Sequence, residues 1–122
     1  MALINKKELT KVMKIIRKFN EIDPQMSVLQ ANAFLSAAID DDINTIANVR
    51  DELLKYGGTK SNVSRNVSEW TNESWRRSDG SRPPGRGYLQ SHPDPEDYRR
   101  KLLSVTHKGM AFCAELSRIM ED

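Results

Sequence analysis

The sequence predicts an α+β fold that is mainly α-helical, with one small β-hairpin near the C-terminal end. Apolar residues recur at helical spacing in five segments of the chain. Gly-Gly, Pro-rich and Asp-rich stretches separate these segments and mark turns. Two short extended runs with a turn between them precede the last helical segment and predict the hairpin. A length of 122 residues suits a single domain, residues 1–122.

The first two helices are expected over residues 6–20 and 28–39. Asn5 is a suitable N-cap for the first helix. The apolar stripe of this helix consists of Leu9, Val12, Met13, Ile16 and Phe19. Ser27 and Gln30 have capping-box spacing at the start of the second helix. The second helix is almost wholly apolar or small, so we expect it to form the buried centre of the domain.

A third helix is expected over about residues 46–55, with Thr45 as its N-cap. Residues 43–44 can form a very short strand before it. Tyr56-Gly57-Gly58 ends this helix, because Gly-Gly is a strong turn signal.

The fourth helix is expected over about residues 60–72, after Thr59. Val63, Val67 and Trp70 recur at helical spacing and are expected to face the core. The other sides of this helix carry Ser, Asn, Arg and Lys. It therefore combines a narrow apolar seam with a broad polar and cationic face.

A loop and a hairpin are expected after the fourth helix. Gly, Pro, Ser and Arg dominate residues 73–87, which predicts a loop. The two strands are expected over residues 87–91 and 100–105, with a polar turn at residues 92–97, where two prolines restrict the backbone. A last helix is expected over residues 107–121, with Thr106 as its N-cap.

Composition narrows the class of protein. Apolar residues make up 38% of the chain and charged residues 30%, as in ordinary soluble domains. No apolar run reaches the roughly 18–20 residues of a membrane crossing, and the basic N-terminus lacks the apolar core of a secretion signal, so we expect a cytoplasmic protein. One cysteine and two histidines do not suggest a disulfide or a structural zinc site. Since no catalytic triad or carboxylate pair stands out either, we expect no metal, no cofactor and no enzyme activity.

The charges are segregated along the chain. Residues 1–20 hold six basic side chains and one acidic one, whereas residues 21–59 hold two basic and seven acidic ones. Residues 60–101 hold nine basic and six acidic side chains. Such segregation can create a local positive face although the net charge is only +2. It is compatible with binding to nucleic acid.

The order of a helix, a turn, a helix and then a hairpin is typical of a winged helix-turn-helix DNA-binding domain. The major groove of B-DNA admits one α-helix, where Arg can pair with guanine and Asn with adenine. The helix at about residues 60–70 has the apolar edge and the polar face that such a reading helix needs. The sequence therefore predicts a reading helix at 60–70 and a wing at 88–105.

Three stretches of the chain resemble the MarR family of bacterial transcriptional regulators. Met26-Ser27, followed by Gln30, Phe34 and Leu35, is similar to the start of the family's second helix. Asn62-Val63-Ser64-Arg65 resembles the family's reading-helix motif. The strongest likeness lies at residues 94–109, where the family wing has Asp-x-Arg followed by hydrophobic-Thr-x-x-Gly; here these are Asp97, Arg99, Val105, Thr106 and Gly109. The resemblance covers about residues 26–110.

The resemblance implies a homodimer that binds a pseudo-palindromic operator in double-stranded DNA. It implies a wing in which Arg99 enters the minor groove and Asp97 holds the wing in shape. Residues 26–106 would form the winged helix-turn-helix, and the terminal segments 1–25 and 107–122 would dimerise. The family also implies a small-molecule effector of unknown identity. A loop at 73–87 that looks like an insertion departs from the family pattern.

The residues expected to contact DNA lie on the reading helix, in the loop and on the wing. Asn62 and Arg65 are expected to specify bases, and Lys60, Arg99 and Arg100 to hold the backbone. The full set is Lys60, Ser61, Asn62, Ser64, Arg65, Ser68, Arg76, Arg77, Arg82, Arg86, Arg99 and Arg100. A solvated loop without DNA contact is an equal alternative for the four loop arginines in this set.

Two other functions fit the same fold, because fold alone does not determine function. The chain could be a protein-interaction module, for example an inhibitor of a host protein, with the loop 73–87 and the acidic segment 21–59 as its surfaces. It could also be a DNA-replication accessory protein that binds DNA without regulating a promoter. We expect a transcriptional regulator, and a repressor in particular.

Overall fold

Five α-helices and one antiparallel hairpin make up the part of the chain that the computed structural model describes, residues 4–39, 45–72, 78–81 and 83–122. In chain order, these elements are α1 (Lys6–Ile22), α2 (Val28–Ile39), α3 (Ile46–Leu53), the 3₁₀ helix η1 (Leu54–Tyr56), α4 (Lys60–Ser68), β1 (Leu89–Asp94), β2 (Asp97–Val105) and α5 (His107–Glu121). The predicted mainly helical α+β class is thus confirmed.

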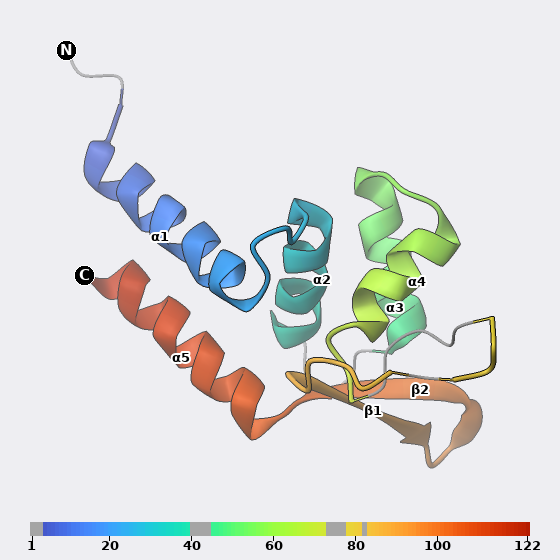
Figure 1. Ribbon diagram of the computed structural model, residues 1–122. Coiled ribbons are helices and arrows are strands. Elements are labelled where there is room, and N and C mark those ends of the chain that lie inside the picture. The colour runs from blue at the N-terminus through green and yellow to red at the C-terminus, as the bar shows by residue number, and fades with distance from the viewer. Residues whose placement is uncertain (1–3, 40–44, 73–77, 82) are drawn as a thin grey trace.

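The elements divide into an arm and a body (Figure 1). The arm consists of α1 and α5, which run antiparallel, so that the start of α1 and the end of α5 lie together at its outer end. Lys18 Nζ lies 3.7 Å from Glu115 Oε2, and Lys11 Nζ donates to the carbonyl oxygen of Met120 at 3.0 Å. The body consists of α2, α3, α4 and the hairpin.

Side-chain caps begin each of the five α-helices, as the sequence predicts. In each case an oxygen of the capping side chain accepts a hydrogen bond from the backbone N–H three residues later, which satisfies a donor that the helix leaves unpaired. The caps are Asn5, Ser27, Thr45, Thr59 and Thr106. The helix starts are therefore confirmed.

An aromatic cluster joins the arm to the body. Its members are Phe19, Phe34, Trp70, Tyr88 and Phe112, whose neighbouring ring centroids lie 4.9–6.4 Å apart. Trp70 is fully buried, and its Nε1 donates to the carbonyl oxygen of Gln30 at 2.7 Å, so the indole has a polar partner inside the core. The predicted inward positions Val63, Val67 and Trp70 are all fully buried.

Several boundaries differ from the prediction. α4 ends at Ser68 and not near 72, because the carbonyl oxygens of Trp70 and Thr71 accept hydrogen bonds from the backbone of residues 87–89. The strands are longer than predicted, and residues 92–94 belong to β1 and not to the turn. Pro93 pairs with Lys101, which a two-stranded ribbon permits because each strand has an edge that needs no N–H donor.

The apolar stripe predicted on α1 is mostly exposed. Phe19 is buried, whereas the other four stripe residues, Leu9, Val12, Met13 and Ile16, are 40–56% exposed. The side of α1 that is at least partly buried carries Lys11, Ile15, Phe19 and Ile22 instead. α1 thus has more apolar surface than the other described residues cover.

Candidate nucleic-acid interface

A glycine turn sets the position of α4 relative to α3. Gly57 and Gly58 have φ values of +122° and +89°, a region that residues with side chains rarely adopt. They reverse the chain between η1 and α4. Val63 and Val67 then anchor α4 on the core, and Lys60, Ser61, Asn62 and Arg65 are left exposed, with Ser64 and Ser68 partly buried. The predicted polar face of this helix therefore faces outward.

The hairpin carries an exposed cationic run. Tyr98, Arg99, Arg100 and Lys101 are consecutive in β2 and all exposed. At its base the hairpin is fixed by buried Leu89 and Leu103 and by a bridge between Thr45 and Leu102.

Asp97 holds the start of this cationic run. Its Oδ1 accepts hydrogen bonds from the backbone N–H of Arg99 at 3.1 Å and from Arg99 Nε at 3.2 Å. The guanidinium of Arg99 is nevertheless almost entirely exposed. Asp97 therefore orders the backbone near the turn while the arginine stays accessible.

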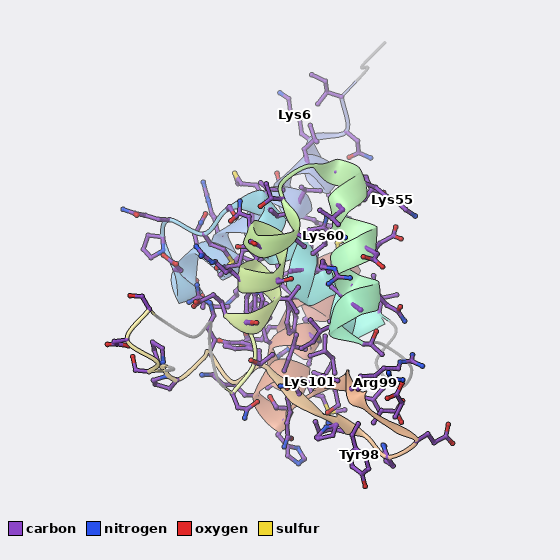
Figure 2. All side chains as sticks on the ribbon, turned by 90° about the vertical axis from the view of Figure 1, so that its right-hand side faces the viewer. Lys6, Lys55, Lys60, Tyr98, Arg99 and Lys101 are labelled. Carbon is purple, nitrogen blue, oxygen red and sulfur yellow. The ribbon has the colours of Figure 1, made fainter. Side chains whose placement is uncertain are left out.

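Exposed residues of α4 and of the hairpin lie on one side of the molecule. Figure 2 shows this side, with Lys55 and Lys60 on the helices above and Tyr98, Arg99 and Lys101 on the hairpin below. Sequence reasoning did not include Lys55, Tyr98 and Lys101. The run Arg99-Arg100-Lys101 in a predicted wing is a signal that could have found Lys101. Lys55 pairs with Glu52 at 3.0 Å, and this hydrogen bond raises the pKa of Lys55 above its usual value.

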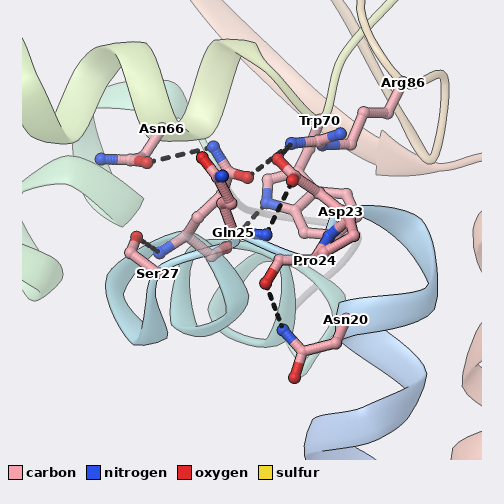
Figure 3. Close-up of polar contacts among 9 residues, drawn as sticks. Asn20, Asp23, Pro24, Gln25, Ser27, Asn66, Trp70 and Arg86 are labelled. Atoms are coloured by element: carbon pink, nitrogen blue, oxygen red, sulfur yellow. Dashed lines mark hydrogen bonds and ion pairs between the residues drawn. The ribbon is translucent and has the colours of Figure 1, made fainter.

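Arg86 does not join this exposed surface. Its Nη2 donates to Asp23 Oδ2 at 3.1 Å and to Gln30 Oε1 at 2.7 Å, and its guanidinium lies 5.5 Å from the ring centroid of Trp70 (Figure 3). We expected Arg86 to contact DNA, but its side chain is used inside the molecule, where it can neutralise Asp23. The expectation that Gln30 completes a capping box is also wrong, because its side chain bonds Arg86 and Asn66 instead.

Several predicted residues lie outside the described residues, namely Arg76, Arg77 and Arg82, as do residues 43–44 of the expected short strand. The described part of the loop joins the end of α4 by backbone hydrogen bonds, including Gly85 N–H to the carbonyl oxygen of Asn72 at 3.1 Å.

An apolar groove continues the uncovered stripe of α1. It lies between α1 and α2, has a volume of 330 Å³, and is lined mainly by apolar side chains, including Ile15, Ile16, Met26, Ala31 and Leu35. Ile16 belongs to both the stripe and the groove. The exposed stripe and the groove therefore meet on α1.

The described residues contain no group of three His, Cys, Asp or Glu side chains that could hold a metal ion. In the same part of the chain, every helix is too short or too polar to cross a membrane. Comparisons with protein-family models, with curated proteins and with solved structures find no match for this chain, so the MarR resemblance stays a prediction from the sequence.

Proposed function

We propose that this chain is a transcriptional regulator, a repressor, that binds a specific sequence in double-stranded DNA through a winged helix-turn-helix. α4 enters the major groove, and the hairpin is the wing beside the adjacent minor groove. One observation carries the proposal: Lys60 of α4 and Arg99 and Lys101 of β2 are exposed on the same side of the molecule (Figure 2).

The chemistry of this side suits DNA. Asn62 and Arg65 on α4 are of the types that pair with adenine and guanine edges. Lys60, Arg99, Arg100 and Lys101 neutralise phosphates, which gives affinity and register without sequence information. The buried seam of Val63 and Val67 holds the helix firmly enough for base contacts to be specific.

The proposed regulator is a homodimer that forms through the arm. Leu9, Val12, Met13 and Ile16 are exposed along one face of α1, and Met110 and Met120 are exposed on α5. A second copy of the chain supplies the same apolar side chains and the same groove, so its arm can cover this surface. Two copies related by a two-fold axis would present two α4 helices to two half-sites.

Selection from a randomised double-stranded DNA pool at physiological salt tests the proposal. We expect enrichment of inverted half-sites with centres about one helical turn apart or slightly less. A pool that stays random would overturn the proposal. It would favour a protein-interaction module, for which the exposed apolar surface of the arm would be the binding face.

Arg65→Ala tests the reading role of α4. We expect it to relax the preference at one base pair by about 1–3 kcal/mol, because one side-chain contact to a base edge is lost. The selected sequence of the variant is compared with that of Arg118→Ala, which removes an exposed arginine from α5 in the arm. An unchanged preference in Arg65→Ala would remove Arg65 from the reading role.

A further inference from the structure

A chain of polar side chains connects α4 to the segment before the hairpin (Figure 3). Arg86 Nη2 donates to Gln30 Oε1 at 2.7 Å. Gln30 Nε2 donates to Asn66 Oδ1 at 3.2 Å, and Asn66 Nδ2 donates to the carbonyl oxygen of Asn62 at 3.0 Å. We call Arg86, Gln30 and Asn66 the relay. It begins in the segment before β1, passes through α2 and ends on the polar side of α4.

The direction of the relay follows from donor and acceptor chemistry. A guanidinium has five N–H donors and no acceptor. Gln30 must therefore turn its oxygen toward Arg86, which leaves its NH₂ group facing Asn66. Asn66 must then turn its own oxygen toward Gln30, so that its NH₂ group faces Asn62. The orientation of each amide is imposed by the group before it.

The first residue of the relay is held from several sides. The backbone N–H of Arg86 donates to the carbonyl oxygen of Glu69 at 2.8 Å, and Lys108 Nζ donates to the carbonyl oxygen of Arg86 at 3.0 Å. Asp23, the ionic partner of Arg86, accepts the backbone N–H of Gln25 at 3.0 Å. This bond and the guanidinium of Arg86 hold the pKa of Asp23 below its usual value. The relay therefore starts at a fixed cation.

We propose that Gln30 is a positioning residue for sequence reading. Because the Arg86 guanidinium can only donate, Gln30 must turn its NH₂ group toward Asn66. This fixes the orientation of the Asn66 amide, and with it the hydrogen-bonding groups of α4 beside Asn62 and Arg65. Asn62 and Asn66 are four residues apart and so lie on the same side of the helix. This role rests on the proposed function, because it takes α4 as the helix that reads DNA.

Gln30→Glu tests the relay without breaking its contact with Arg86. The introduced carboxylate still accepts from the guanidinium, but its other oxygen cannot donate to Asn66. The Asn66 amide then turns its NH₂ group toward the carboxylate and loses its hydrogen bond to the carbonyl oxygen of Asn62. The matched control is Gln25→Glu, which adds the same charge in the neighbouring turn, where the side chain is exposed and outside the relay.

Two measurements on the full chain read the result. The first is the side-chain amide signal of Asn66 in an ¹⁵N–¹H NMR spectrum. The second is the ratio of the affinity for the selected DNA site to the affinity for unrelated DNA. An added negative charge weakens the attraction to the phosphates of both DNAs alike, so this effect cancels in the ratio. We expect Gln30→Glu to move the Asn66 signal and to lower the ratio by about fivefold or more, the lower range for one base contact. Gln25→Glu should change neither.

Two outcomes would overturn the inference. One is an Asn66 signal in Gln30→Glu that stays at its wild-type position. The other is an affinity ratio that stays equal to that of Gln25→Glu. If Gln30→Glu does not fold, Gln30→Met gives the same test, because it removes both relay bonds with a side chain of similar length. A wild-type chain that selects no DNA sequence would instead overturn the proposed function, and the Asn66 signal would still decide whether the relay exists.

Discussion

At the scale of single residues, Gly109 shows how a sequence motif follows from close packing. Thr106 Oγ1 accepts the N–H of Gly109 at 3.1 Å and donates to the carbonyl oxygen of Gly87 at 2.7 Å. The first turn of α5 is thereby drawn against the backbone of Tyr88. A Cβ atom at Gly109 would clash with the carbonyl oxygen of Tyr88 and would lie only 2.7 Å from Val105 Cγ1. The Thr-x-x-Gly spacing at the start of α5 therefore has a structural cause in this chain.

Gly109→Ala tests this packing, because two effects of opposite sign compete. Helix propensity alone would make alanine more stable than glycine by about 1 kcal/mol. The clash with the Tyr88 backbone should outweigh this, and we expect a net loss of about 1–3 kcal/mol in the free energy of unfolding, as for other overpacked sites. Urea unfolding measures the change. Ser117→Ala, at an exposed position of the same helix, should be neutral or slightly stabilising. A stabilised Gly109→Ala would contradict the close contact.

Residue roles were predictable from the sequence where they depend on near neighbours. Each helix start was correct, because an N-cap bonds to the backbone only three residues further on. The role of Arg86 was missed, because its partner Asp23 lies 63 positions away in the sequence. An arginine in a Gly- and Pro-rich loop gives no local sign that a carboxylate and a glutamine will meet it. The exposed positions of Lys60 and Arg65 needed only the periodicity of their own helix, whereas Arg99 was named from the MarR resemblance.

At the scale of elements, the ends of helices and the limits of strands were harder to predict than the starts of helices. α4 stops at Ser68 because residues 87–89 bond to the carbonyl oxygens that follow it, and this contact joins segments that are distant in the sequence. The hairpin was expected to be shorter, since Pro93 and Pro95 suggest a wide turn. The pairing of the two strands instead continues through Pro93, because the hydrogen bonds between the strands do not require an N–H donor at that position.

The exposed cationic run of β2 leads to a prediction about Lys101. The residue extends the exposed run of Arg99 and Arg100, so in the proposed complex it neutralises one further phosphate. We expect Lys101→Ala to reduce the slope of log K against log salt concentration by about 0.9, the value for one released counterion. Titrations of the selected DNA site over a range of salt concentrations give this slope. Lys14→Ala, which removes an exposed lysine from α1, should leave it unchanged. A lower affinity with an unchanged slope would exclude a phosphate contact for Lys101.

At the scale of the whole molecule, the arm and the body use their apolar residues differently. The body fully buries Phe34, Trp70 and Leu53, and its exposed apolar side chains include Val28 and Ile39 at the two ends of α2. The arm leaves most of the α1 stripe open, although the spacing of that stripe is the clearest helical pattern in the chain. The periodicity could predict an apolar face, but not whether the same chain or a second copy covers it. The stripe and the groove share Ile16, and in the proposed homodimer the second copy covers both.

Val12→Glu tests this assignment at the centre of the exposed stripe. A charge there would have to lose its hydration in an apolar interface, so we expect the variant to be a monomer at concentrations at which the wild type is a dimer. Because Val12 is 49% exposed within one chain, the fold of the monomer should tolerate the change. Sedimentation equilibrium measures the mass, and circular dichroism checks the helix content. Thr10→Glu adds the same charge at an exposed position outside the stripe and should remain dimeric. If both variants keep the wild-type mass, the arm is not the dimer interface; if the wild type is itself a monomer, the exposed stripe needs a different partner.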